Sequence, residues 1–348
     1  MAKTPTTFLR EATGLVRELS ALDATILSIA GIIGPTWIVI FVGEWSLYPG
    51  VSVPASFLIM AVLGSIWGVY YVVISSLFSR SGGGGYVPLS RTIHPALGMA
   101  MSFLVVCAYV FNLGFIASII LPVAILGPLK TFATLTANAG LQSLAGTLGT
   151  ELWTVISGTV ALILVGLVAI AGGKYILRVN KIAFVVGTLG FIVIIGVLLS
   201  TSPSHFEALY NSYAGSPAAY QNVTATAQAS GYAPPSDWLM PTLLSLPVTF
   251  FTITGFQTST YFSGEIRKVS RSMLIAVIGS IAYGGILFSL VAELMQNQLG
   301  SSFVTSSAYD FNVAGKWALN VPPYANTFVA IINDNVFVTG ILILSIIA

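Results

Sequence analysis

The sequence predicts an all-α integral membrane protein, and three observations support this fold class. Only 7% of the residues are charged while 56% are hydrophobic, whereas a soluble domain carries roughly 25% charged residues. The apolar runs are about 20 residues long or longer, which is the length that spans a bilayer as a helix. These runs also lack the alternating pattern of a transmembrane barrel strand. A chain of this composition cannot cover a water-facing surface.

Eight membrane spans follow from the apolar runs, with approximate ends. They cover residues 21–43, 54–78, 97–125, 152–172, 180–200, 241–263, 272–296 and 327–348. The segment 201–240 has no Lys or Arg and is predicted to be an outer loop. The last span runs to the end of the chain without a polar flank, so we expect a chain truncated in its eighth helix.

Lysine and arginine are unevenly distributed over the two sides of these spans. With the N-terminus in the cytoplasm, the inner side holds Lys3, Arg10, Arg17, Arg80, Arg91, Lys174, Arg178, Lys181, Arg267, Lys268 and Arg271. The outer side holds only Lys130 and Lys316. Because inner loops carry the excess of basic residues, the sequence predicts a multi-pass protein of the plasma membrane with a cytoplasmic N-terminus.

Two spans contain residues that interrupt a helix. In "AGIIGPTWIV", Gly31, Gly34 and Pro35 fall within five positions, and Gly costs about 1 and Pro about 3 kcal/mol relative to Ala inside a helix. The sixth span, "LPVTFFTITGFQTSTYF", has a second break around 252–256, with Pro247 shortly before it. A packing glycine or a proline kink accounts for either break alone. Two breaks in spans that run in opposite directions instead indicate a secondary-transporter site, since backbone leaves the helix at membrane depth only where it is buried or lines a cavity.

Four stretches carry a resemblance to a known family. "AGIIGPTWI" resembles a glycine-rich first-helix motif, and "FSRSGGGGYVPLSRTIHPALGMAMSF" (78–103) resembles a loop between a second and a third helix. "FFTITGFQTSTYFSGEIRKVSRSM" (250–273) resembles a sixth-helix motif, and "GGKYILRVNKI" (172–182) resembles a short inner loop before a fifth helix. Over residues 20 to 275 the sequence resembles the amino acid–polyamine–organocation (APC) superfamily of transporters, and in particular its amino acid permeases.

This resemblance implies a five-plus-five inverted-repeat transporter fold with broken helices 1 and 6. The chain would form one transmembrane transporter domain, 1–348. Its first repeat would cover about 20–200 and its second about 240–348, the latter incomplete.

The resemblance also implies where a substrate binds. Its carboxylate would meet the first break, at Ile33, Gly34, Pro35 and Thr36, although Pro35 has no N–H to donate. Its amine would meet the second break, at Phe251, Thr252, Ile253, Thr254 and Gly255, and Phe251 matches an aromatic residue that covers the bound substrate. On the third span, Tyr109 and Asn112 are candidate pocket residues, and packing within the bundle is the alternative reading of both.

Candidate gate residues lie around the same region. Phe251 would close the pocket, and Glu265 would pair with Arg80 or Arg91 at the inner side, where a positive-inside anchor is the simpler alternative.

The coupling ion stays open between Na⁺ and H⁺. The region that would carry a coupling lysine in the fifth span contains Val186 and Gly187 instead, and Ser345 is a possible sodium ligand. His94 and His205 lie in loops far apart, so no structural metal and no cofactor is predicted.

The function predicted from these features is secondary active transport of amino acids by alternating access. No Lys, Arg, Asp or Glu lies clearly in the middle of spans one, three, five or six, which favours a neutral or zwitterionic substrate. The alternatives are a transporter of other amines or polyamines, and a sensor on the same fold that binds without transporting. An enzyme is disfavoured, because no span carries a nucleophile with a base. The expected partners are the amino acid and the lipid bilayer, with no nucleic acid; the sequence leaves the oligomeric state open.

Overall fold

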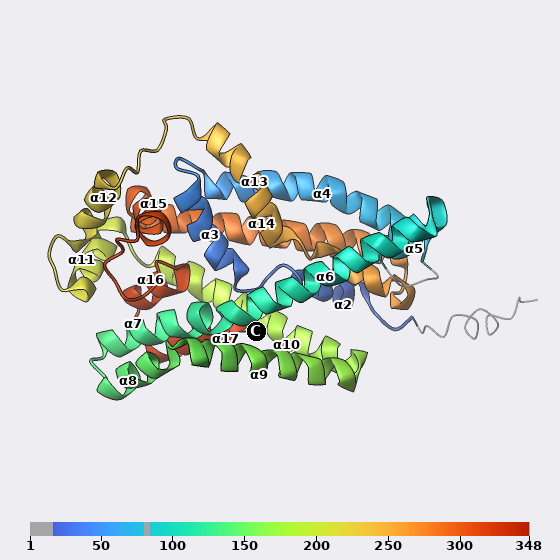
Figure 1. Ribbon diagram of the computed structural model, residues 1–348, viewed down its shortest axis with the longest axis horizontal. Coiled ribbons are helices and arrows are strands. Elements are labelled where there is room, and N and C mark those ends of the chain that lie inside the picture. Colours follow the sequence, from blue (N-terminus) through green and yellow to red (C-terminus); the bar gives the residue numbers. More distant parts are fainter. Residues whose placement is uncertain (1–16, 80–83, 348) are drawn as a thin grey trace, which may run out of the picture. The chain divides into compact units, whose positions relative to one another are not determined.

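The computed structural model describes residues 17–79 and 84–347, and within these ranges every regular element is a helix (Figure 1). The α-helices are α2 (Ala21–Ala30), α3 (Thr36–Leu47), α4 (Val53–Leu77), α5 (Tyr86–Thr92), α6 (Pro95–Ile119), α7 (Gly127–Leu135), α8 (Ala139–Leu148), α9 (Glu151–Ala171), α10 (Gly173–Leu199), α11 (Pro203–Ala214), α12 (Ala219–Ala229), α13 (Leu239–Ile253), α14 (Val269–Leu299), α15 (Ser301–Tyr309), α16 (Ala325–Ile332) and α17 (Val336–Ile347). A 3₁₀-helix, η2 (Phe256–Glu265), and two π-helical segments, η1 (Ile120–Leu126) and η3 (Asp310–Ala314), complete the described elements. The predicted all-α class is confirmed.

Long apolar helices identify the chain as a membrane-embedded protein. Six helical stretches are long and apolar enough to cross a bilayer, with ends at 53–77, 95–135, 151–171, 173–199, 239–265 and 269–299. On α9 the apolar side chains of Val155 and Ile170 are 66% and 85% exposed. Contiguous exposed apolar surface of this kind suits lipid rather than water.

Two predicted span boundaries, the start of the fifth and the end of the third, are wrong. The fifth span begins at Gly173 rather than 180, because Lys174, Arg178 and Lys181 form the first turns of α10 instead of a loop. The third span continues beyond 125, through the π-helical segment η1 and on through α7 to Leu135.

The eighth predicted span, 327–348, is not one helix. α16 ends at Ile332 and α17 begins at Val336. Between them, Asn333 and Asn335 turn their side-chain oxygens to nearby backbone N–H groups, and such local bonds compete with helix formation.

The predicted outer loop 201–240 contains two helices. α11 begins with a capping Ser202 followed by proline, and it ends at Gly215, which adopts a left-handed conformation. α12 follows after four residues. These start and stop signals are typical of a short helix.

The chain divides into two compact units. The first consists of Met1–Ile32, Ala61–Asn112 and Ile253–Gly284, and the second of Ile33–Met60, Leu113–Thr252 and Gly285–Ala348. Each unit draws on both predicted repeats, so the inverted repeat stays a prediction.

Backbone pairing holds α2 and η2 together in the first unit. Leu19 donates its N–H to the carbonyl of Glu265 (3.0 Å), and its carbonyl accepts from the N–H of Arg267 (2.9 Å). Ser28 on α2 donates its hydroxyl to the carbonyl of Phe256 (2.7 Å).

An aromatic cluster forms part of the core of the second unit. Its members are Trp37, Phe41, Trp45, Phe57, Phe191 and Phe288. Trp37 stacks on Phe288 with ring centroids 5.8 Å apart, and aromatic pairs add about 0.5–1.5 kcal/mol beyond their burial. This cluster fixes the start of α3, which follows the first break.

Candidate functional site

The first break lies between Ala30, the end of α2, and Thr36, the start of α3. Pro35 precedes α3 and supplies no side-chain cap. Within the described ranges, the backbone N–H groups of Ile33, Gly34 and Thr36 make no hydrogen bond. The first N–H groups of a helix have no partner inside it and attract anions, so this break presents unpaired donors.

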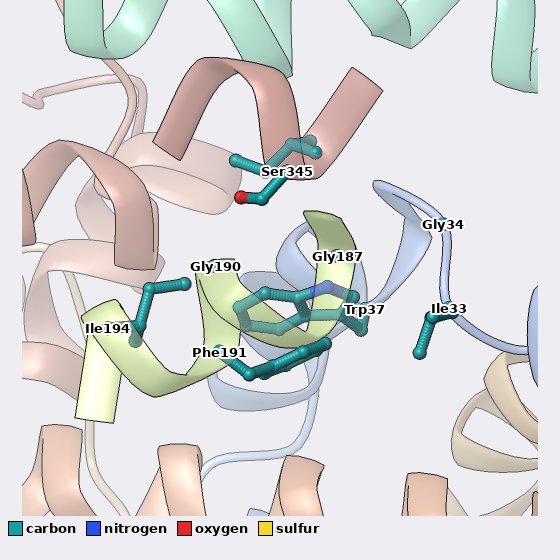
Figure 2. Close-up of a pocket in the computed structure, with 9 residues that line it drawn as sticks. Ile33, Gly34, Trp37, Gly187, Gly190, Phe191, Ile194 and Ser345 are labelled. Carbon is teal, nitrogen blue, oxygen red and sulfur yellow. The ribbon is translucent and has the colours of Figure 1, made fainter. Parts of the chain in front are cut away.

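A small cavity lies beside this break in the second unit. It holds about 20 Å³, room for one water molecule, and it is lined by Ile33, Gly34, Trp37, Gly187, Gly190, Phe191, Ile194, Ser345 and Ile346. Figure 2 shows Ser345 facing Gly190, whereas Ile33 and Gly34 lie on a third segment, the one that precedes α3. An amino acid needs a wider opening than this geometry provides.

Two glycines on α10 let α17 approach the cavity. A Cβ at Gly190 would overlap the Cβ and hydroxyl of Ser345, and a Cβ at Gly187 would lie 3.8 Å from the Ser345 carbonyl. The Ser345 hydroxyl donates to the Leu342 carbonyl (2.9 Å). Ser345 therefore lies next to residues of the first break, as the sodium hypothesis requires, and its hydroxyl is already engaged.

At the second break, nearby residues of the same segment form hydrogen bonds with the backbone N–H and carbonyl of Gly255. α13 ends at Ile253, and Gly255 adopts a φ of +130° before η2 begins. The Gly255 N–H donates to Oε1 of Gln257 (3.1 Å), and its carbonyl accepts from the N–H (2.9 Å) and hydroxyl (2.6 Å) of Thr258.

The chain segments of the two breaks meet at two glycines of the first unit. A Cβ at Gly31 would lie 2.7 Å from the Gly255 carbonyl oxygen and 2.8 Å from the Thr258 hydroxyl. A Cβ at Gly255 would overlap the Gly31 carbonyl. Only residues without a side chain permit backbone to approach backbone this closely.

The remaining second-break candidates differ in exposure. Phe251 is 42% exposed and contacts the ring of Phe115 (6.2 Å). Thr252 is buried, and within the described residues its hydroxyl has no hydrogen-bond partner. Ile253 is fully buried in the first unit, to which Thr254 also belongs.

Tyr109 and Asn112 both belong to the first unit. The ring of Tyr109 lies 6.4 Å from that of Tyr261 on η2, and Tyr109 is 39% exposed. Asn112 is half-buried. The contact with η2 brings Tyr109, but not Asn112, to the element that follows the second break.

The inner gate remains a prediction. Arg80 lies outside the described residues, and between Glu265 and Arg91, which are described, no ion pair forms. Arg267 instead donates through Nε to the Arg17 carbonyl (3.1 Å), and Arg17 donates to the Ser79 carbonyl (3.0 Å). The first bond fastens the chain just before α2 to the segment after η2, and the second fastens it to the residues just after α4.

The sequence reasoning missed two buried acids, Asp310 and Glu44. It ended the first span at residue 43, whereas α3 continues to Leu47 and buries Glu44 completely. The signal was present, since the apolar stretch continues past the glutamate through "WSLYPGV".

No protein-family model and no curated protein sequence matches this chain.

Proposed function

We propose that this protein is a secondary transporter of small zwitterions, most simply neutral amino acids, in the plasma membrane. The observation that carries the proposal is the first break, where the N–H groups of Ile33, Gly34 and Thr36 lack partners among the residues that the structure describes. Unpaired backbone in an apolar environment costs about 1–3 kcal/mol for each group. A ligand that accepts hydrogen bonds would recover this cost.

The carboxylate end of the substrate suits this first break. The N-terminus of a helix carries roughly half a positive charge, and α3 starts here with no side-chain cap. Thr36 adds a hydroxyl in a position that is 7% exposed.

The amine end suits the C-terminus of α13. This helix ends at Ile253. The last carbonyls of a helix accept no hydrogen bond from an N–H group within the helix. The partial negative charge there attracts a cation. The hydroxyl of Thr252, which has no partner in the described part of the chain, offers a further polar contact.

Alternating access follows as the mechanism of the proposal. Substrate binding shifts a protein only by its difference in affinity between two states. The proposal therefore requires that the donors of the first break bind the substrate more tightly in one state than in the other.

The test is a ligand panel applied to the purified chain in detergent. Thermal unfolding is followed with each amino acid and with simple amines and carboxylates; a true ligand at 100 times its Kd stabilises by about 2.7 kcal/mol. We expect stabilisation by zwitterions and not by their decarboxylated amines.

Radiolabelled uptake into liposomes, with and without Na⁺ or a pH gradient, then separates a transporter from a sensor. Stabilisation by amines alone would place the substrate in the polyamine class.

A further inference from the structure

Glu44 is a buried acid that the substrate site does not use. It lies in the last turns of α3 and has no exposed surface. Burying an isolated ionised carboxylate is very costly unless it is paired and hydrogen-bonded.

Three hydroxyl groups from two other helices surround its carboxyl. Ser56 on α4 donates to Oε2 (2.7 Å), and Thr249 on α13 donates to Oε1 (2.8 Å). Ser245 on α13 lies 3.4 Å from Oε2. All four residues belong to the second unit.

Each hydroxyl also has a second acceptor within reach. These are the carbonyls of Val53 for Ser56 (2.8 Å), Thr242 for Ser245 (2.9 Å) and Ser245 for Thr249 (3.3 Å). A hydroxyl has one hydrogen and accepts through its lone pairs. Ser56 can therefore donate to an ionised Glu44, or turn its hydrogen to Val53 and accept one from a protonated Glu44. The same heavy-atom arrangement fits both states.

No cation compensates this carboxyl among the residues that the structure describes. α13 and the part of α4 in the second unit carry no titratable side chain. The titratable groups on the other elements packed against α3 are Lys174, Tyr175, Arg178 and Lys181 on α10, Glu293 on the part of α14 in the second unit, Tyr309 on α15 and Asp310 on η3.

These groups do not neutralise Glu44. The charged residues of α10 lie in its first nine positions, whereas the contact with α3 runs through Phe191. Glu293 is exposed and accepts from Asn297 (2.9 Å), and Tyr309 donates to the Ser230 carbonyl (3.2 Å). Asp310 is itself an acid.

We propose that Glu44 is a proton-binding site, protonated while α3 packs against α4 and α13 and deprotonated when these helices separate. A neutral carboxyl avoids the desolvation cost of a buried charge, and oxygens at hydrogen-bonding distance are bridged by hydrogens rather than by a larger cation. The further step, that this proton drives substrate movement, rests on the proposed function. It selects H⁺ from the two coupling ions that the sequence leaves open.

Infrared spectroscopy tests the proton site without any substrate. The purified chain is measured in an ester-free detergent at about pH 8, where ordinary Asp and Glu side chains are ionised. Burial raises the pKa of Asp310, on the segment outside the membrane spans, to about 6, with Lys316 opposing the shift, so Asp310→Asn is the matched control. We expect a carboxylic-acid C=O band that Glu44→Gln removes and Asp310→Asn keeps.

A second variant guards against a misfolded Glu44→Gln protein. Thr249→Val removes the donor to Oε1, and the band should shift to the frequency of a less hydrogen-bonded carbonyl. A band that is absent from the wild-type chain, or that survives in Glu44→Gln, overturns the proposal and favours an ionised carboxylate with a bound Na⁺.

Liposome transport tests the coupling step separately. For a substrate that the wild-type chain accumulates under a pH gradient, Glu44→Gln should lose accumulation but retain exchange. Gradient-driven accumulation by Glu44→Gln refutes the coupling. If the wild-type chain moves no substrate, the proposed function fails, whereas the infrared band still decides the proton site.

Discussion

At the second break, Gly255 donates its N–H to Gln257 and its carbonyl accepts two bonds from Thr258. At the first break, Ile33 and Gly34 have N–H groups without a partner in the described chain. Both breaks interrupt an apolar helix, yet one is closed by its own side chains and the other is not. The difference favours a structural role for the second break. It leaves the first break with donors that a ligand can bind, as the proposed function requires.

The largest effect should come from Gly255→Ala. Its φ of +130° costs a residue with a side chain about 1–3 kcal/mol, and the new Cβ would overlap the Gly31 carbonyl. We expect a large fall in thermal stability in detergent. Gly279→Ala is the control, since nothing lies within 4 Å of its Cβ position in α14, and Ala favours a helix. Equal melting temperatures for the two variants would mean that the glycine crossing is not tight.

A smaller loss should follow from Gln257→Ala. This change leaves the buried Gly255 N–H without its acceptor, which costs about 1–3 kcal/mol. Gln228→Ala, at an exposed position of α12, is the control. Thermal unfolding followed by tryptophan fluorescence measures both, and an unchanged Gln257→Ala protein would remove the contrast between the breaks.

At the first break, Thr36→Val should weaken substrate binding and leave folding intact. Loss of one neutral hydrogen bond costs about 0.5–1.5 kcal/mol, or about two- to twelve-fold in Kd. The control is Thr159→Val, which removes a comparable hydroxyl from the exposed face of α9 and should leave affinity unchanged. Unchanged affinity for Thr36→Val in a binding titration would exclude its hydroxyl from the site.

The smallest effect should come from Pro35→Ala. The variant gains an N–H and a freer backbone, so stability should fall by about 0.4–1 kcal/mol while affinity for a carboxylate does not fall. Pro203→Ala, at the start of α11, should lower stability in the same way without any change in affinity. Weaker binding by Pro35→Ala alone would show that the rigid turn matters more than the extra donor.

Sequence patterns located both breaks because glycine and proline act locally. Gly31, Gly34 and Pro35 predicted the end of α2, and the predicted break at 252–256 contains the observed one at Gly255. The partners of Gly255 were not predictable, because no sequence pattern pairs its N–H with the side chain of Gln257. Its amide oxygen turned out to receive a backbone N–H.

Burial of Glu44 could not be read from its neighbours in the chain. Its partners Ser245 and Thr249 lie about 200 residues away, and only the fold brings them together. Hydropathy assigned the glutamate to a span end, where a charged residue usually meets water.

The pairing of Leu19 with Ile266 also has a consequence for the chain during its synthesis. Arg17 and Arg267, which flank this pair, are separated by 250 positions. At roughly 5–20 residues per second of synthesis, α2 exists for about 12–50 s before η2 is made. During that interval Ser28 lacks the Phe256 carbonyl to which it donates in the finished fold. We therefore expect a newly made chain to be most vulnerable to proteases and to quality control before its sixth span has entered the membrane.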